Sequence, residues 1–396
     1  MTTAPTDPAR HSRRPRGSRT GVRIAVATLV AVPVFGLTAA WATYAHLQGN
    51  LETADGVDEY LGASRPTVAT SADPLTDGFA GAPLNILVMG VDARDGDNAK
   101  FAGYVEGQRS DSTFLVHLPA DRSRIDVVSI PRDSLVDIPS CLLADGTETG
   151  DRTMTMFNAA FEIGSGPDDD LTTAAACTRR TFEQNTGLRT DEHVVVKMDG
   201  VRDVIDVLGG VPFCFPEAMD SDDAKLHVEA GPRVLDGKTS IAFLRARTGT
   251  GWGLWIGSDL GRLDRQHAFL EALTDKVHDE DLLGDPAQLL KVLDRATKSL
   301  AVSPGLGDLR TLAGLANGLR GIDGTEIEAI TVPNEPYGKK GRVVWTAAAD
   351  DVWQRIREDR PLTDPTPTSP RSHGTGGKGT GTGSTPDPQE STGPCG

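Results

Sequence analysis

The amino-acid sequence predicts an α/β fold with a mixed central β-sheet flanked by helices, preceded by one N-terminal transmembrane helix. Short apolar runs with the length of buried strands occur through the first half of the chain, and segments of helical periodicity follow or separate them. An uncharged apolar run near the N-terminus predicts the transmembrane helix. The 396 residues suffice for one large domain or two ordinary ones.

The charge is divided unevenly along the chain. The formal net charge is −16, from 40 Lys and Arg against 56 Asp and Glu. Residues 1–23 hold six arginines and only one acid, Asp7, so they carry +5 and leave −21 for the rest. A protein whose main task is coating nucleic acid is excluded by such an acidic body. We therefore expect no nucleic acid among its partners.

The basic head is followed directly by the predicted membrane span. No Asp, Glu, Lys or Arg occurs from Ile24 to Leu51, and residues 24–45 are long enough to cross a bilayer. Arginines before the span predict a cytoplasmic segment 1–23 and an extracellular body. A cleaved signal peptide is the alternative, but its apolar region usually has only about 7–15 residues. The sequence favours a retained signal-anchor, with single-pass insertion into the cell membrane.

The remaining chain divides into three segments by composition. Residues 46–83 mix polarities and predict an extracytoplasmic stalk, and residues 84–358 predict one folded α/β domain. Residues 359–396 are rich in Gly, Pro and Thr, which predicts a disordered tail. An oxidising compartment permits one disulfide among Cys141, Cys177 and Cys214, and the sequence leaves its pairing open, together with the role of Cys395.

Strands and helices in the predicted domain follow from hydrophobic patterning. Apolar runs predict four buried strands, at Leu84–Gly90, Ser112–Leu118, Ile125–Ile130 and His193–Met198. Helical periodicity predicts six helices, at Leu171–Asn185, Gly200–Leu208, Lys238–Arg247, Leu260–His278, Ala287–Lys298 and Ala347–Glu358. Their alternation predicts a mixed or mostly parallel sheet covered on both faces.

Reactive side chains gather in five short clusters. These are Asp92 with Arg94, Arg109 with Asp111, Arg132 with Asp133, Arg245 with Arg247, and Asp259 with Arg262, Arg265 and Gln266. Three clusters lie at strand ends, where open α/β sheets form ligand clefts. Guanidinium groups bind phosphate oxygens bidentately, and carboxylates beside such a ligand commonly hold Mg²⁺. Together the clusters predict a site for a phosphate ester, with no nucleophilic Ser or Cys elbow.

Each cluster also has a purely structural explanation. Asp92 and Asp111 are suited to turns at strand ends, and Arg132 with Asp133 is a natural local ion pair. Arg245 and Arg247 would diverge by about 200° on a continuous helix, so both face one cleft only if the helix ends there. Asp259 is a natural N-cap for the next helix. The prediction of a site therefore depends on the whole set of clusters.

In this order and behind one membrane helix, the clusters resemble the LytR-CpsA-Psr family, with features of its actinobacterial branch. The motifs are GVDAR at 90–94, RSDS at 109–112, SIPRD at 129–133, FNAAF at 157–161, LDG at 235–237 with RAR at 245–247, and DLGRLDRQ at 259–266. The resemblance covers 84–280 and continues to about 358. It implies an extracytoplasmic phosphotransferase that ligates an anionic cell-wall glycopolymer from a polyprenyl-pyrophosphate carrier to peptidoglycan, forming a phosphodiester.

The resemblance also implies roles for individual residues. The metal, Mg²⁺ with Mn²⁺ as an alternative, would be held by Asp92 and Asp111. Asp259, Arg132 and Arg262 would be catalytic, with Asp259 activating the acceptor hydroxyl or fixing an arginine. The set that would bind the pyrophosphate is Arg109, Arg132, Arg245, Arg247, Arg262 and Gln266, with Arg94 and Arg265 as second choices. An apolar groove between sheet and helices would take the lipid.

Three other functions remain open at this stage. A polyprenyl-pyrophosphate hydrolase would use the same site with water as acceptor. A membrane-anchored transcriptional attenuator would need a DNA-binding domain, and about 23 cytoplasmic residues are too few for a helix-turn-helix. A non-catalytic wall-binding protein would use the Gly/Pro-rich tail as a spacer. The sequence leaves the glycopolymer, the carrier, the acceptor hydroxyl and the oligomeric state undetermined.

Overall fold

The computed structural model describes residues 37–62, 65–66, 79, 81–91, 109–252, 254, 260–280, 284–322, 326–338 and 341–363. The chain divides into two compact units, Met1–Leu47 and Gln48–Gly396. In the first unit, residues 37–47 are helical. Among the described residues no helix has the length and apolarity needed to cross a membrane. Residues 24–36 of the predicted span lie outside the described residues.

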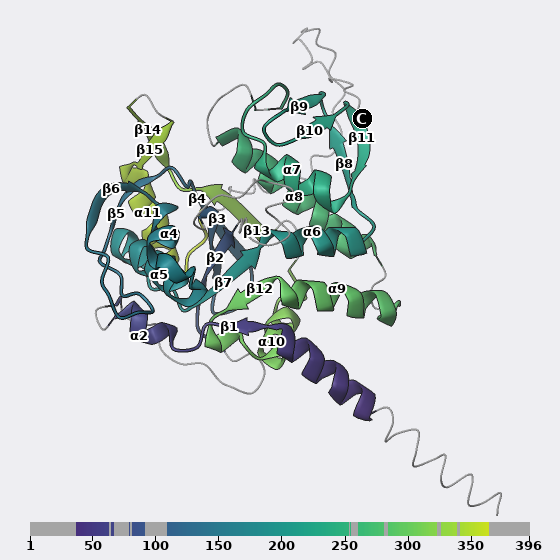
Figure 1. The fold of residues 1–396 in the computed structure, drawn as a ribbon, viewed down its shortest axis with the longest axis horizontal. Helices are drawn as coiled ribbons and strands as arrows, with labels where there is room; N and C mark the ends of the chain where they lie inside the picture. Colours follow the sequence, from purple (N-terminus) through teal and green to yellow (C-terminus); the bar gives the residue numbers. More distant parts are fainter. Residues whose placement is uncertain are drawn as a thin grey trace, which may run out of the picture. The chain divides into compact units, whose positions relative to one another are not determined.

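The second unit is built on a seven-stranded mixed sheet (Figure 1). In spatial order its strands are β1 (Glu52–Thr53), β12 (Leu300–Val302), β7 (Glu192–Lys197), β2 (Leu84–Val91), β3 (Ser110–Leu118), β4 (Ile125–Ile130) and β13 (Ile327–Thr331). β3 runs antiparallel to both β2 and β4, whereas β7 is parallel to β2 and β13 is parallel to β4. The four predicted strands are confirmed, and the sheet is mixed rather than mostly parallel.

Helices cover the sheet and extend beyond it (Figure 1). They are α2 (Val57–Leu61), α4 (Ala159–Ser165), α5 (Leu171–Thr186), α6 (Met198–Val207), α7 (Gly237–Arg245), α8 (Leu260–Asp279), α9 (Pro286–Lys298), α10 (Leu309–Gly318) and α11 (Ala347–Arg357). The six helices predicted from periodicity are all present. The others are short or carry mixed faces, so their periodicity is weak.

The remaining strands form four two-stranded ribbons. They pair β5 (Leu135–Ile138) with β6 (Arg152–Met156), β8 (Val211–Phe215) with β11 (Gly231–Leu235), β9 (Met219–Ser221) with β10 (Leu226–Val228), and β14 (Asn334–Tyr337) with β15 (Arg342–Trp345). None of these was predicted, since three to five residues give too short a pattern to identify a strand.

Among the described residues, three larger hydrophobic cores and a small one beside α2 hold the domain together. The largest packs one face of the sheet against α4, α5 and α11, with Phe161, Phe182 and Trp353 fully buried. A second lies on the other face of the sheet against α10. The third joins α6, α7, α8 and the β8–β11 region around Phe243, apart from the sheet. The domain thus has a sheet part and a second, helical part, each with its own core.

One disulfide lies in the largest core. Cys141, which follows β5, is bonded to Cys177 of α5. Both side chains are buried. The structure therefore selects one of the pairings that the sequence left open. Cys395 lies outside the described residues.

The segment predicted as a stalk begins inside the domain. β1 pairs with β12 in the central sheet, and Val57 and Leu61 of α2 are buried against α5. The domain boundary at residue 84 is therefore too late. A two-residue strand and a five-residue helix give no detectable periodicity, so only the structure reveals them. At the other end, the Asp359 carboxylate accepts a hydrogen bond from the Ala120 backbone N–H and contacts His117, so the first residue of the predicted tail is bound to the domain.

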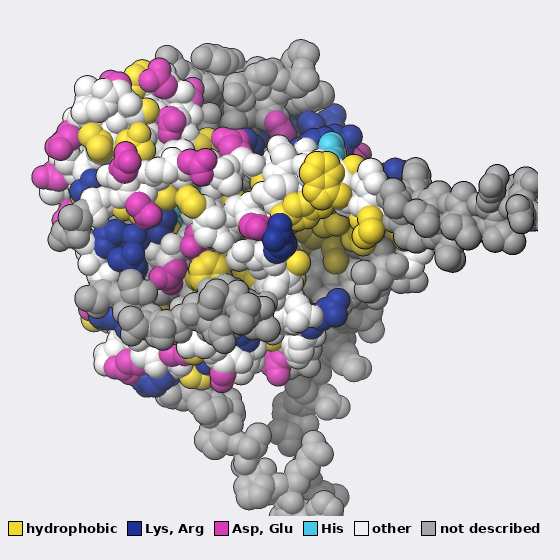
Figure 2. Space-filling model, turned by 90° about the horizontal axis from the view of Figure 1, so that it is seen from below, with side chains coloured by type: hydrophobic (Ala, Val, Ile, Leu, Met, Phe, Trp, Pro, Cys, Tyr) yellow, Lys and Arg dark blue, Asp and Glu magenta, His cyan; other side chains and the backbone are white. Residues whose placement is uncertain are grey.

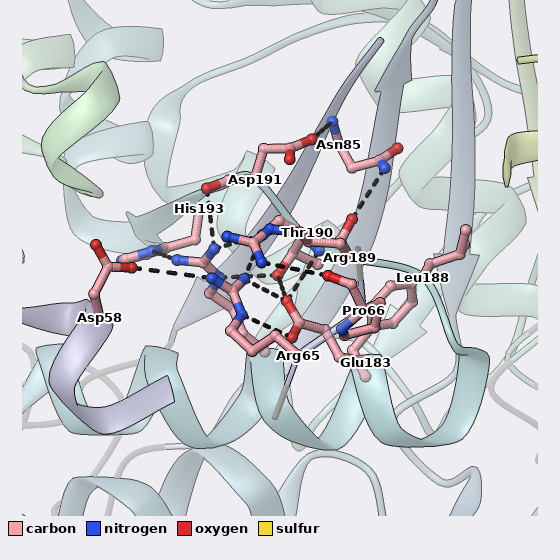
Figure 3. A network of polar contacts seen from close by, with 12 residues as sticks. Asp58, Arg65, Pro66, Asn85, Glu183, Leu188, Arg189, Thr190, Asp191 and His193 are labelled. Atoms are coloured by element: carbon pink, nitrogen blue, oxygen red, sulfur yellow. Dashed lines mark hydrogen bonds and ion pairs between the residues drawn. The ribbon is translucent and has the colours of Figure 1, made fainter. Parts of the chain in front are cut away.

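A buried polar network fixes α5 to the loop before β7 (Figure 3). Arg179 is almost fully buried and donates to the carbonyl oxygens of Thr190 and Asp191, at 2.6 and 3.0 Å. Arg65 donates to both carboxylate oxygens of Glu183, at 2.6 and 3.0 Å, and also to the Thr190 carbonyl. Residues of the predicted stalk are thus tied to the domain by charge-assisted hydrogen bonds.

Protonation states in this network follow from its burial. Burial alone would raise the pKa of Glu183, but hydrogen bonds from Arg65 and Thr190 hold this pKa below its usual value. Burial, together with the nearby Arg179, lowers the pKa of His193 to about 3, so its ring is neutral. The network consequently contains one carboxylate that must be charged and one imidazole that must not be.

We predict that Glu183→Gln lowers the free energy of unfolding at neutral pH by about 3 kcal/mol, because among the described residues it leaves the buried Arg65 with only the more distant Asp58, at 3.9 Å, as an ion-pair partner. Since the pKa of Glu183 is lower in the folded state, its contribution is complete above the unfolded pKa. It is lost as the pH falls through the folded pKa. Urea unfolding of both proteins from pH 7 to pH 3 measures the difference, which should shrink with acidification.

The exposed Glu358 provides the matched control, because its carboxylate also carries a lowered pKa, through hydrogen bonds with Gln354 and Arg360. Glu358→Gln should change the stability far less than Glu183→Gln at every pH, because water screens the contacts of this exposed carboxylate. A stability difference for Glu183→Gln that is absent at pH 7, or constant down to pH 3, would contradict the role of this network.

Candidate functional site

The candidate site lies at one edge of the central sheet. β2 ends at this edge, β3 begins there and β4 ends there, because β3 runs antiparallel to both neighbours. Asp111 is therefore at the start of β3, and Arg132 follows the end of β4. Asp92 follows the end of β2 directly, but it lies outside the described residues, as do Arg94 and Asp259.

The Asp111 carboxylate lies between two guanidinium groups. Its Oδ1 is 3.1 Å from Nη1 of Arg132, and its Oδ2 is 2.9 Å from Nη2 of Arg247. Arg132 also has Nε 3.4 Å from Oδ2 of Asp133, so the local ion pair considered from the sequence exists as well. Three of the predicted site residues, far apart in sequence, are thus in direct contact. All three remain partly exposed, so a ligand can reach them.

Arg247 reaches this edge from the second part of the domain. The side chain of Asp236 caps α7 at its start, and the helix ends at Arg245. Ala246 has left helical geometry, with φ −57° and ψ 128°, so Arg245 and Arg247 need not diverge as they would on a helix. The condition set from the sequence, that the helix must end between these two arginines, is met. Arg245 itself is half-buried in the last turn of α7.

Arg265 holds the segment that follows α7. Its side chain is 1% exposed and donates from Nη2 to the Ala246 carbonyl at 2.5 Å. A second bond runs from Nη1 to the Trp252 carbonyl at 2.9 Å. The sequence made Arg265 a second choice for binding pyrophosphate. In the structure it instead fixes the backbone next to Arg247.

Gln266 brings α8 to the same edge. Its Nε2 donates to the Ser112 hydroxyl at 3.1 Å, next to Asp111 on β3. Its other amide atom, Oε1, is buried and has no hydrogen-bond partner among the described residues. Gln266 therefore lies where it was predicted to lie. Arg262 is on the same helix one turn earlier, and its side chain is not among those described.

Arg109 points to a different neighbour. Its Nε is 2.6 Å from Oε2 of Glu162 on α4, and both side chains are well exposed. Sequence reasoning did not identify Glu162, although it directly follows the FNAAF motif. In this structure Arg109 is therefore paired outside the cluster around Asp111.

The FNAAF motif holds the chain segment that carries Arg132. Phe157 and Phe161 are fully buried in the largest core. The backbone N–H groups of Phe157 and Asn158 donate to the carbonyls of Ser134 and Arg132, at 2.8 and 3.2 Å. The motif thus fixes the segment that carries Arg132. Because these bonds use backbone atoms, the motif's sequence does not reveal them.

The described residues offer a metal one carboxylate at the centre of the site. Mg²⁺ prefers one or two carboxylates together with phosphate oxygens and water. Asp111 is such a carboxylate, and each of its oxygens contacts an arginine. An anionic ligand would attract those guanidiniums and leave a carboxylate oxygen for the metal. The residues present fit a metal that binds together with a phosphate.

We predict that Arg265→Met lowers the free energy of unfolding by about 3 kcal/mol or more, because two buried carbonyls lose a charged donor. Hydrogen exchange should accelerate for the backbone of residues 246–252. Arg109→Met is the matched control, since its ion pair is exposed and should be worth at most about 1 kcal/mol. Unchanged exchange in Arg265→Met would contradict the anchoring role.

Comparisons with known proteins find relatives with cell-wall names. The chain is 31% identical over 294 residues to a protein named probable cell wall biosynthesis protein LcpB from Corynebacterium glutamicum, covering 72% of this chain and 64% of that one. It is 30% identical over 239 residues to the Bacillus subtilis protein named polyisoprenyl-teichoic acid–peptidoglycan teichoic acid transferase TagV, covering 59% and 52%. The chain therefore spans about half to two thirds of these relatives.

A solved structure supports the fold. The structure titled LytR-Csp2A-Psr enzyme from Actinomyces oris matches with a TM-score of 0.52 at 19% identity, over 74% of this chain and 96% of that one. At this identity the match speaks for the fold alone. The sequence model of the LytR_cpsA_psr family matches residues 50–359, which begin beside β1 and end just after α11. The chain belongs to the LytR-CpsA-Psr family.

Proposed function

We propose that this protein is a membrane-anchored phosphotransferase that moves an anionic cell-wall glycopolymer from a polyprenyl-pyrophosphate carrier to peptidoglycan. The observation that carries the proposal is the contact of Asp111 with Arg132 and Arg247 at a sheet edge, beside Gln266. Arginines gathered around one carboxylate suit a ligand with several negative charges and a metal. The transferase name of the Bacillus subtilis relative supports the same reaction class.

The arginines would bind the pyrophosphate. Guanidinium groups remain charged at any physiological pH and present paired donors to phosphate oxygens. Arg132 and Arg247 can exchange the Asp111 carboxylate for phosphate oxygens with little movement of the backbone, since neighbouring hydrogen bonds hold their chain segments. Arg245, Arg262 and Arg109 are the further cations that we propose for the same ligand.

Mg²⁺ would be held by Asp111 together with Asp92, with Mn²⁺ as an alternative. When bound, the metal would neutralise charge on the pyrophosphate oxygens. The role of Asp111 is then to exchange arginine partners for a metal. Arg132 and Arg262 would stabilise the charge on the transferred phosphoryl group and on the departing polyprenyl phosphate.

The transfer itself would be a substitution at phosphorus. A sugar hydroxyl of peptidoglycan forms a P–O bond to the phosphate attached to the glycopolymer, and the P–O bond to the polyprenyl phosphate breaks. The hydroxyl proton passes to a carboxylate, for which we propose Asp259. The products are a phosphodiester and polyprenyl phosphate, which leaves with the electron pair of the broken bond.

A half-buried apolar face of the sheet would take the lipid. Val194, Val88 and Phe114 are cross-strand neighbours on β7, β2 and β3, and each remains partly exposed. Ser112, which receives the hydrogen bond from Gln266, is two residues before Phe114 and therefore on the same face. An isoprenoid chain on this face would have its pyrophosphate end at the arginine cluster.

The proposed location is the outer side of the cell membrane. The span at 24–45, with arginines only before it, would keep residues 1–23 in the cytoplasm and the domain outside. A polyprenyl carrier and peptidoglycan are both reached from that side. A reporter fused after residue 60 should therefore be extracytoplasmic.

Replacing the central residues tests the reaction. Arg132→Ala and Asp111→Ala should each lower transfer at least about a hundredfold, because each removes a group that stabilises developing charge. The assay supplies the full chain with lipid-linked glycopolymer, peptidoglycan and Mg²⁺, and quantifies the phosphodiester product. Removal of Mg²⁺ by a chelator should stop the reaction, and added Mg²⁺ should restore it.

The exposed Arg320 is a matched control, and Arg320→Ala should retain full activity. Wild-type transfer activity in Arg132→Ala or Asp111→Ala would contradict the assignment of these residues to the transfer site. Release of glycopolymer at the same rate with and without peptidoglycan would identify the protein as a hydrolase instead.

The lipid face can be tested by chain length. Phe114→Ser removes about 2 kcal/mol of apolar contact. It should weaken binding of a long polyprenyl carrier by more than about tenfold relative to a short one. Comparing both carriers within one variant cancels any general loss of stability. Val234→Ser, on the exposed surface of β11, should leave the ratio unchanged, and an unchanged ratio in Phe114→Ser would contradict the lipid path.

A further inference from the structure

α9 has three different faces along its length. Leu289, Val292 and Ala296 are half-buried on the side that packs against α6. Leu290 and Leu293 are instead exposed, at 40% and 37%. One turn apart, they lie on one side of the helix. Two exposed leucines together on an otherwise well-packed helix call for an explanation.

The remaining face of α9 is basic. Lys291, Arg295 and Lys298 follow one another at helical spacing of four and three residues, and all three are exposed. Asp294 is the one acid on the helix, and it is 2.9 Å from Lys298. A basic stripe beside exposed leucines stands out in a chain that carries −21 after residue 23. This combination is typical of helices that lie in a membrane interface.

Residues just after the predicted span are fixed to α9 and to the start of α10. The Asn50 side chain donates to Asp294 and Thr297 of α9, at 3.0 and 3.1 Å. Gln48 donates to the Gly307 carbonyl and accepts from the Leu309 backbone, both at the start of α10. If the span ends at residue 45 as predicted, Gln48 and Asn50 follow it by only three and five residues. The parts of α9 and α10 that they bind would then lie close to the bilayer surface.

The contact points on α9 coincide with its apolar side. Thr297 lies four residues after Leu293 and seven after Leu290, so all three are on neighbouring positions of one helix side. The leucines thus extend from the point where Asn50 is bound. Figure 2 views the molecule from the side on which β1 and α10 lie in Figure 1, and hydrophobic and basic side chains are both exposed there.

We propose that α9 lies on the outer surface of the membrane, with Leu290 and Leu293 inserted among lipid headgroups and Lys291, Arg295 and Lys298 bound to lipid phosphates. This inference rests on the membrane anchoring included in the proposed function. Its occupant is an anionic lipid bilayer, because the basic stripe needs negative charge and the leucines need an apolar layer beneath it. The contact would hold the domain in one orientation above the bilayer.

Photo-crosslinking in vesicles tests the contact. The full chain, with benzoylphenylalanine in place of Leu293, is reconstituted into vesicles of three parts phosphatidylcholine to one part phosphatidylglycerol. Illumination should give lipid adducts that mass spectrometry detects. The same label in place of Val234, an exposed residue on β11, should give few. Vesicles of phosphatidylcholine alone should give fewer adducts at position 293.

Reversing charges on α9 measures the electrostatic contribution to its contact with the membrane. Lys291→Glu with Arg295→Glu should lower the adduct yield at position 293 by about fivefold for each basic side chain lost. Arg233→Glu with Lys238→Glu makes the same change of charge at exposed positions elsewhere and should have no effect. Adducts to a protein rather than to lipid at position 293 would overturn the proposal.

Flotation of the vesicles reports the anchor independently. A chain that floats, but gives equal adducts at positions 293 and 234, overturns the α9 contact and leaves the proposed phosphotransferase untouched. A chain that does not float with the vesicles overturns the membrane anchoring and the α9 contact with it. Floating, anionic-lipid-dependent adducts at position 293 support both.

Discussion

The Asp111 carboxylate is the interaction on which the candidate site depends, because it joins the two parts of the domain. Arg132 follows β4 of the central sheet, whose residues line the largest core, whereas Arg247 follows α7, whose residues line the third core. Two guanidiniums at this distance would repel each other without an anion between them. The carboxylate therefore holds the two arginines together, and in the proposed function a more highly charged anion would take its place.

Hydrogen bonds to the backbone would let the arginines exchange partners at little cost in free energy. The segment of Arg132 is held by N–H groups of the FNAAF motif, and the segment of Arg247 by the buried Arg265. Neither support uses the guanidinium groups that would bind substrate. The arginines can thus change partners while their main chains stay fixed, which is the preorganisation that electrostatic stabilisation of a phosphoryl group requires.

These supporting contacts are also the part of the site that the sequence could not predict. Hydrophobic runs located β2, β3, β4 and β7, and strand ends correctly brought Asp111 and Arg132 to one edge, since that argument needs only the strand directions. Arg265 looked like another phosphate ligand, because an arginine in a motif is identical in sequence whether it binds substrate or backbone carbonyls. Two of the groups that Arg179 binds, the carbonyls of Thr190 and Asp191, are likewise main-chain atoms, which have no sequence signature.

The chain enters the domain at the other side of the sheet from β13, where β1 pairs with β12. Gly307, which binds Gln48, follows β12, and β12 ends beside the start of β7, at the edge opposite Asp111. β2 spans eight residues between these edges, or about 25 Å at roughly 3.3 Å per residue. α9, in contrast, ends beside the start of β12, which pairs with the end of β7, and Glu52 forms an ion pair with Lys197 there. The end of β7 lies beside the end of β2, at the edge that carries Asp111. If α9 lies at the membrane as proposed, the arginine cluster is at the same edge of the sheet, three strands away, or about 14 Å at roughly 4.8 Å per strand. The carrier would then bridge the width of these strands rather than the length of β2, so its pyrophosphate could reach the arginines while its isoprenoid stays close to the bilayer.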